Sequence, residues 1–126
     1  MATKVLVVDD SKASRYGLRN WISKEEGTEI FEAANGLEGL ERFKEHQPDV
    51  TFLDLTMPVM DGFEALEEIR KIDSLAVVVV LTADVQQKTT QRVQELGAFM
   101  VLKKPPIKDN IIDALYKGLT ARGKGR

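Results

Sequence analysis

Five short hydrophobic runs recur along the chain, each followed by a longer stretch in which hydrophobic and polar residues are mixed. We expect the runs to form β-strands at residues 4–8, 29–33, 50–53, 77–81 and 99–102. The run VVVVL at 77–81 has no polar residue and is mostly β-branched, which is typical of a parallel strand covered on both faces.

The stretches between the runs place hydrophobic residues three or four positions apart, the spacing of one helix face. They predict helices at about 12–24, 37–45, 62–72, 85–96 and 107–119. Trp21 is expected to pack in or beside the core. The stretch 85–96 contains only Val85, Val93 and Leu96 as large hydrophobic residues, so we expect it to be the most mobile helix.

Turn-forming pairs separate these elements, among them NG at 35–36, DG at 61–62 and PP at 105–106. Regular alternation of strands and helices predicts an α/β fold with a doubly wound, mostly parallel sheet and right-handed crossovers. We find no internal repeat or linker and expect one domain over residues 1–120. The remaining stretch, ARGKGR at 121–126, is basic and glycine-rich, and we expect it to be disordered.

Composition excludes several classes of function. The 126 residues carry a formal net charge of −2, which argues against a nucleic-acid-binding domain. No hydrophobic run approaches the ~18 residues of a membrane span, and the N-terminus lacks the hydrophobic region of a signal peptide. The absence of cysteine excludes thiolate chemistry and fits a cytoplasmic protein. The one histidine, His46, is expected to be a solvated loop residue.

Polar residues stand at the carboxyl ends of four of the five predicted strands, the edge where a doubly wound sheet binds ligands. They are Asp9 and Asp10, Asp54, Thr82, and Lys103 and Lys104. Three carboxylates in one cleft are costly, since two unit charges ~4 Å apart repel by about 4 kcal/mol at an effective dielectric constant of 20. We therefore expect a cation there.

Oxygen donors without histidine or cysteine indicate a hard divalent ion, Mg²⁺ or alternatively Mn²⁺. One Mg²⁺ and one lysine together cancel the charge of three ionised carboxylates. Such a cleft is equipped for phosphoryl transfer to Asp54, which would form an acyl phosphate. Lys104 would stabilise charge on the transferring oxygens, and Thr82 would offer a hydrogen bond.

Four segments, VLVVDDS, VTFLDLTMPVMDGFEAL, VVVVLTA and GAFMVLKKP, occur in this order within residues 4–120. Together they resemble the receiver domain of two-component response regulators, especially the stand-alone chemotaxis type. The resemblance implies the flavodoxin-like (βα)5 receiver fold with strand order 2-1-3-4-5. It also implies a phosphorylation-dependent signalling switch, not an enzyme: such a domain catalyses only its own phosphorylation and dephosphorylation.

The resemblance also assigns roles. Asp54 becomes the phospho-acceptor; Asp10 and Asp54 bind Mg²⁺ directly, Asp9 through water, and Thr56 through its backbone carbonyl. Thr82 and Lys104 contact the phosphoryl group.

Lys104 is preferred to Lys103 because it directly precedes Pro105, and in the family that peptide bond is cis. Asp61 is expected to cap the following helix. The family usually has an aromatic residue where this chain has Val101. Since valine cannot signal by ring rotation, we expect coupling to run through movement of 83–96.

The implied partners are a sensor histidine kinase or phosphotransfer protein, and a target protein docked on the 83–119 face. Neither nucleic acid nor membrane is involved, and we expect a monomer. A phosphate sink, a phosphorelay intermediate and a receiver excised from a larger regulator remain alternatives.

Three readings outside this scheme are weaker. A haloacid-dehalogenase-type phosphatase needs a second aspartate where this chain has Thr56. A flavodoxin-like cofactor binder would bring a phosphate against the acidic segment DDSKAS. A degenerate receiver that only binds partners is disfavoured because all five active-site residues are present.

Overall fold

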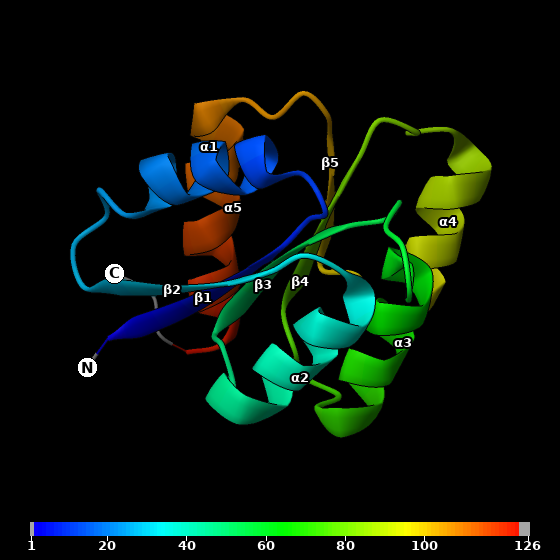
Figure 1. The fold of residues 1–126 in the computed structure, drawn as a ribbon, viewed down its shortest axis with the longest axis horizontal. Coiled ribbons are helices and arrows are strands. Elements are labelled where there is room, and N and C mark those ends of the chain that lie inside the picture. The colour runs from blue at the N-terminus through cyan, green and yellow to red at the C-terminus, as the bar shows by residue number, and fades with distance from the viewer. Residues whose placement is uncertain (1, 124–126) are drawn as a thin grey trace.

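The computed structural model describes residues 2–123 as a parallel sheet between two layers of helices (Figure 1). The strands are β1 (Thr3–Val8), β2 (Thr28–Ala33), β3 (Val50–Asp54), β4 (Val78–Thr82) and β5 (Met100–Lys103). The helices are α1 (Lys12–Ile22), α2 (Gly36–His46), α3 (Gly62–Ile72), α4 (Gln87–Glu95) and α5 (Lys108–Ala121). Each strand and helix predicted from the hydrophobic pattern is present, with ends that differ by at most two residues.

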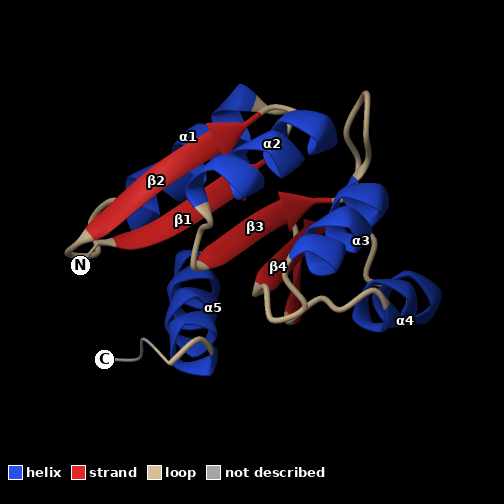
Figure 2. Cartoon of the chain, turned by 90° about the horizontal axis from the view of Figure 1, so that it is seen from below, coloured by secondary structure: helices blue, strands red, loops and turns tan. Residues whose placement is uncertain are grey.

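The strand order is β2-β1-β3-β4-β5 and all neighbouring strands are parallel, which confirms the predicted doubly wound sheet. Figure 2 shows the strand arrows pointing toward one edge. The chain passes from β1 to β2 on one side and then returns to β3 on the other. The direction of winding thus reverses between β1 and β3, and a crevice at their carboxyl ends is the expected ligand site.

Alternate residues of each central strand fill two separate cores. Val5 and Val7 of β1 pack with α1 and α5, in a cluster that includes Leu18, Ile111 and Leu115. Leu6 and Val8 face the other way, toward a cluster that includes Leu40, Leu66 and Val93 of α2, α3 and α4. Trp21 packs at the margin of the first cluster, as expected. Each fully buried aliphatic side chain contributes roughly 1.5–3 kcal/mol to stability, so the central strands are firmly held.

The pairs NG and DG begin helices. Asn35 is the N-cap of α2, and its Oδ1 accepts a hydrogen bond from the Glu38 amide at 2.8 Å. Asp61 is the predicted N-cap of α3, and its Oδ1 accepts from the Glu64 amide at 2.9 Å. The glycine of each pair is the first helical residue, so these motifs fix where α2 and α3 start.

Helix α4 is thinly anchored. Val93 is its only buried residue, and the side chain of its N-cap residue, Gln86, makes no capping hydrogen bond. The Arg92 guanidinium lies 4.0 Å from the centroid of the Phe63 ring, which adds one contact with α3. In Figure 1 the helix lies at the periphery of the molecule. This sparse packing is what the sequence predicted, and the mobility of α4 stays a prediction.

His46 is not the solvated loop residue expected from the sequence. It is the last residue of α2, and its ring stacks on Phe31 of β2 with ring centroids 3.7 Å apart. Helix α2 includes His46 and ends at the next residue, Gln47, which adopts the left-handed conformation with φ of 49°.

The structure describes the first residues of the stretch 121–126, which we expect to be disordered. Helix α5 continues through Ala121, and Nη1 of Arg122 lies 3.0 Å from Oδ2 of Asp73. That ion pair and a bond to the Leu75 carbonyl hold the chain against the loop that leads into β4. Residues 124–126 lie outside the described residues.

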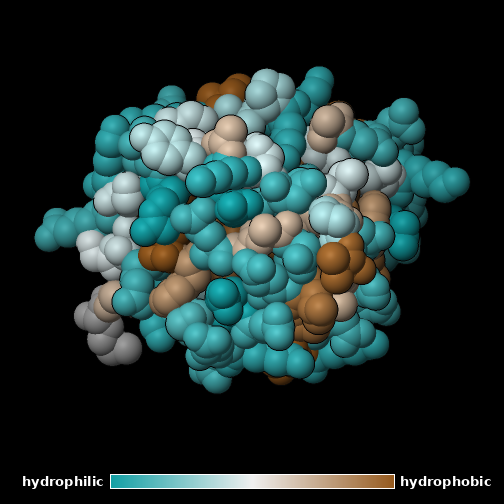
Figure 3. All heavy atoms as spheres, in the orientation of Figure 1, coloured by the Kyte–Doolittle hydropathy of each residue, from teal (hydrophilic) through white to brown (hydrophobic). Residues whose placement is uncertain are grey.

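The face of the molecule seen in Figure 3 is mostly hydrophilic, with a small hydrophobic patch near α3. Within residues 2–123, none of the helices combines the length and hydrophobicity needed to cross a bilayer.

Candidate metal and phosphoryl site

Three carboxylates meet at the reversal point of the sheet. Asp9 and Asp10 directly follow β1, Asp54 is the last residue of β3, and the two strands are paired through Val8 and Leu53. One carboxylate oxygen from each acid lies within 4.8 Å of the others. Asp9 and Asp54 are buried, whereas Asp10 is exposed. The convergence predicted from the strand ends is therefore present.

Lys104 lies inside this cluster and Lys103 does not. The Lys104 ammonium donates to Oδ2 of Asp9 at 2.8 Å and lies 3.3 Å from Oδ1 of Asp54. The Lys104–Pro105 peptide bond is cis. Lys103 is exposed at the end of β5. Of the two lysines, only Lys104 contacts the acids.

Thr82 is the last residue of β4 and is buried at the same edge. Its Oγ1 accepts a hydrogen bond from the Asp84 amide at 3.0 Å. The Asp84 carboxylate in turn accepts from the Gln86 amide and from the Thr89 hydroxyl, at 3.0 and 2.7 Å. Hydrogen bonds thus connect Thr82 through Asp84 to Thr89 in α4. Among residues 2–123, no hydrogen bond connects Thr82 to Asp54.

Burial is the largest influence on the pKa of Asp54 and raises it above its usual value. Lys104 opposes this rise, while the charge of Asp9 adds to it. Burial alone would lower the pKa of Lys104, but its hydrogen bond to Asp9 and the charges of Asp9 and Asp54 together raise it. Lys104 is therefore cationic, and one ammonium faces three acids. The donor set, entirely carboxylate oxygen, fits a hard divalent cation.

Thr56 and Asp61 lie in the loop after Asp54. Thr56 is exposed, and its amide donates to the Asp54 carboxylate, which lowers the pKa of Asp54 and partly offsets burial. Asp61 caps α3 and does not join the acid cluster. Val101 is partly buried and packs against the cluster that contains Val93 of α4.

Sequence reasoning missed how Asp9 is held. Oδ1 of Asp9 accepts from the Ser11 amide at 2.8 Å, and the Asp9 amide donates to the Ala33 carbonyl at 3.0 Å. Nη1 of Arg15 donates to the Asp9 carbonyl at 2.7 Å. The only signal for Arg15 in the sequence is an arginine soon after the acid pair, which is too common a pattern to predict this contact.

A family model of the response regulator receiver domain matches residues 5–116. The chain belongs to this family. It is 36% identical over 119 residues to the chemotaxis protein CheY of Bacillus subtilis, covering 94% of this chain and 99% of that protein. It is 38% identical over 122 residues to sporulation initiation phosphotransferase F of the same organism, covering 94% of this chain and 95% of that protein.

Solved structures agree with this assignment. The CheX–CheY–BeF3–Mg²⁺ complex from Borrelia burgdorferi matches with a TM-score of 0.85 and 30% identity, covering 90% of this chain and 87% of that one. The chain is therefore a receiver domain, a phosphorylation-dependent switch of two-component signalling rather than an enzyme in the usual sense. The haloacid-dehalogenase alternative is not favoured.

Proposed function

We propose that Asp54 accepts a phosphoryl group from a sensor histidine kinase or a phosphotransfer protein. The observation that carries this proposal is the placement of Asp54, which is buried at the end of β3, clustered with the other two acids and 3.3 Å from the Lys104 ammonium. A carboxylate oxygen attacks phosphorus, a P–O bond forms, and the bond from phosphorus to the donor nitrogen breaks, leaving its electron pair on that nitrogen. No general base is needed, because the nucleophile is already ionised.

The surrounding residues receive their roles in the same proposal. Asp9, Asp10 and Asp54, with the backbone carbonyl of Thr56, would hold Mg²⁺ or Mn²⁺. The ion, when bound, supplies positive charge to the transferring oxygens. Lys104 supplies a second positive charge, and the Thr82 hydroxyl leaves the Asp84 amide to bond the phosphoryl group.

Phosphoryl uptake and its dependence on Mg²⁺ test the proposal directly. We expect incubation with phosphoramidate and millimolar Mg²⁺ to add the mass of one phosphoryl group to the chain, measured by intact-mass spectrometry. The same incubation with a chelator should leave the mass unchanged, because the uncompensated charge of Asp9 and Asp10 repels the anionic donor. A chain that takes up no phosphoryl group, or takes it up equally without divalent ions, would contradict the proposal.

The receiver, proposed to span residues 1–120, would signal by docking on another protein through the 83–119 face. Five of the relatives, 36–39% identical to this chain, are chemotaxis proteins, and one, 38% identical, is a sporulation phosphotransferase. Chemotaxis-type output is therefore our first proposal, and a place as a phosphorelay intermediate is the second. As a partner of a histidine kinase, the chain would act in the cytoplasm, as a monomer.

Phosphorylation is expected to change the motion of residues 83–96. The hydrogen bonds from Thr82 through Asp84 to Thr89 give these residues a direct connection to the site, and Val101 has no ring to rotate. We expect backbone NMR relaxation of 83–96 to change when beryllofluoride and Mg²⁺ are added. Residues 62–72 of α3 provide the internal reference, and unchanged relaxation in 83–96 would contradict this route of coupling.

A further inference from the structure

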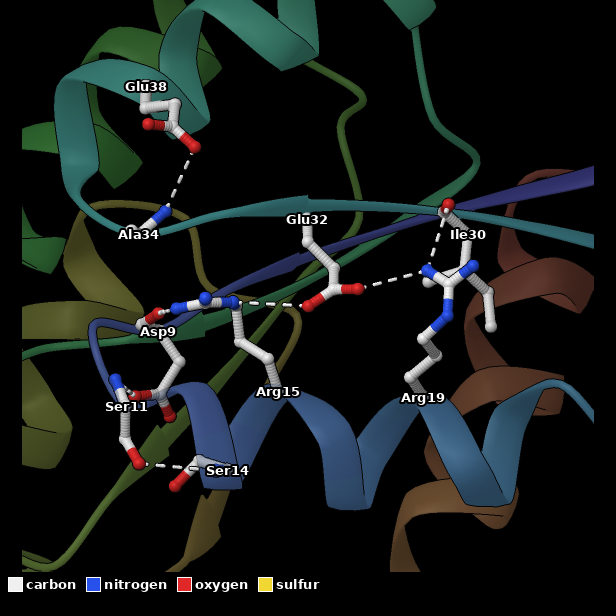
Figure 4. A network of polar contacts seen from close by, with 9 residues as sticks. All are labelled: Asp9, Ser11, Ser14, Arg15, Arg19, Ile30, Glu32, Ala34 and Glu38. Atoms are coloured by element: carbon white, nitrogen blue, oxygen red, sulfur yellow. Dashed lines mark hydrogen bonds and ion pairs between the residues drawn. The ribbon is translucent and has the colours of Figure 1, made fainter.

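Arg15 connects the loop that carries the acid pair to strand β2. Its Nη1 donates to the Asp9 carbonyl at 2.7 Å, and its Nε donates to Oε1 of Glu32 at 3.1 Å (Figure 4). The other oxygen of Glu32 accepts from Arg19 at 3.0 Å. The Arg15 side chain is only 16% exposed, so its geometry is fixed by these partners and not by solvent.

The carbonyl that Arg15 binds belongs to the peptide unit between Asp9 and Asp10. The orientation of this unit sets the direction in which the Asp10 side chain leaves the backbone. Asp9 is also held through its amide and through both oxygens of its carboxylate. Asp10, in contrast, has no side-chain hydrogen bond among the described residues, so only its backbone can aim it at the cluster.

From this arrangement we infer that Arg15 is a positioning residue for the divalent-cation site. Its guanidinium, clamped by Glu32, holds the Asp9–Asp10 peptide so that both carboxylates converge with Asp54. The inference rests on the proposed function, because it concerns the affinity of the proposed metal site. Groups that orient metal ligands without touching the metal commonly affect affinity by about tenfold or more.

Charge and positioning make opposite predictions, which allows a sharp test. A cationic side chain near the acids repels Mg²⁺, so a role through charge alone means that removing Arg15 strengthens Mg²⁺ binding. A positioning role means that the same change weakens it. Arg19 is the matched control, since it pairs with the same Glu32 from the same helix and makes no contact with Asp9.

The experiment is calorimetric titration of the full chain with Mg²⁺ in the absence of a phosphoryl donor. We expect Arg15→Met to bind Mg²⁺ about tenfold more weakly than wild type. Arg19→Met should bind it as tightly as wild type, or slightly more tightly. Arg15→Lys keeps the charge but cannot bond Asp9 and Glu32 with a planar fork, so its affinity should also fall.

Unchanged or tighter binding by Arg15→Met would overturn the inference. If that variant fails to fold, as judged by circular dichroism, Arg15→Lys decides, and an unchanged affinity overturns it. Phosphoryl uptake by the Arg15 variant should recover at saturating Mg²⁺; uptake that stays slow would place Arg15 in the transfer step instead. Wild type that binds no Mg²⁺ would refute the proposed function itself, a result distinct from a difference between variants.

Discussion

Replacing Asp54 by asparagine is expected to abolish phosphoryl uptake. The amide is neutral and a far weaker nucleophile than the carboxylate, and it removes one of three negative charges that attract the metal. The side chains are nearly the same size, so the pocket at the end of β3 is preserved. Intact-mass spectrometry after incubation with phosphoramidate and Mg²⁺ should show only the unmodified mass for Asp54→Asn, under conditions in which wild type gains one phosphoryl group.

Asp61→Asn is the matched control, because it makes the same chemical change in the loop that follows. Asp61 caps α3, and asparagine is an equally good N-cap, so this variant should be phosphorylated like wild type. If Asp54→Asn were still phosphorylated to the wild-type extent, the acceptor would have to be another residue.

Loss of the fold would not explain a loss of uptake by Asp54→Asn. The pKa of Asp54 is raised by burial, so the folded chain binds its proton more tightly than the unfolded chain does. At pH values above the pKa of Asp54 in the folded chain, the ionised carboxylate therefore destabilises the fold. The effect disappears below the pKa of about 3.9 that aspartate has in an unfolded chain, because the carboxyl is then protonated in both states. In Mg²⁺-free solution at neutral pH, Asp54→Asn should unfold thermally at no lower a temperature than wild type.

The sheet and the site residues were predictable because each rests on a strong local pattern. A buried parallel strand is a continuous hydrophobic run, and the residue after it marks the ligand-binding edge of the sheet. Asp9, Asp10 and Asp54 could therefore be grouped before their distances were known. Lys104 could be preferred to Lys103 only through the family resemblance, since both follow the same strand.

What the sequence did not reveal depends on contacts between distant segments. Arg15 bonds a backbone carbonyl, which leaves no mark on the residue that it holds. His46 stacks on Phe31, a residue in another element. The pairs NG and DG suggested turns, because asparagine, aspartate and glycine are all frequent there. In the structure their glycines are needed for space: a Cβ on Gly36 would lie 2.2 Å from the Met60 carbonyl oxygen.

Gly62→Ala is expected to cost about 3 kcal/mol of unfolding free energy, at the upper end of the range for overpacking. An added Cβ would lie 2.2 Å from the carbonyl oxygen of Asp54 and 2.6 Å from Cα of Leu55. Both are backbone atoms, so no side chain can turn away to make room. The Gly62 amide also donates to the Leu55 carbonyl at 2.9 Å, which holds the start of α3 against this loop. Urea unfolding measures the loss.

Gly17→Ala separates this packing effect from the general consequence of replacing a helical glycine. A Cβ on Gly17 in α1 would meet no atom within 4 Å apart from its chain neighbours and its own helix backbone, so alanine should raise stability by up to about 1 kcal/mol through its higher helix propensity. Changes of opposite sign in the unfolding free energy of the two variants would show that the end of β3 and the start of α3 are in direct contact.

This contact includes the backbone of Asp54, so relief of the clash in Gly62→Ala must shift the proposed acceptor. Gly62→Ala should therefore bind Mg²⁺ more weakly than Gly17→Ala, and equal stability and affinity in the two variants would contradict this account of the loop.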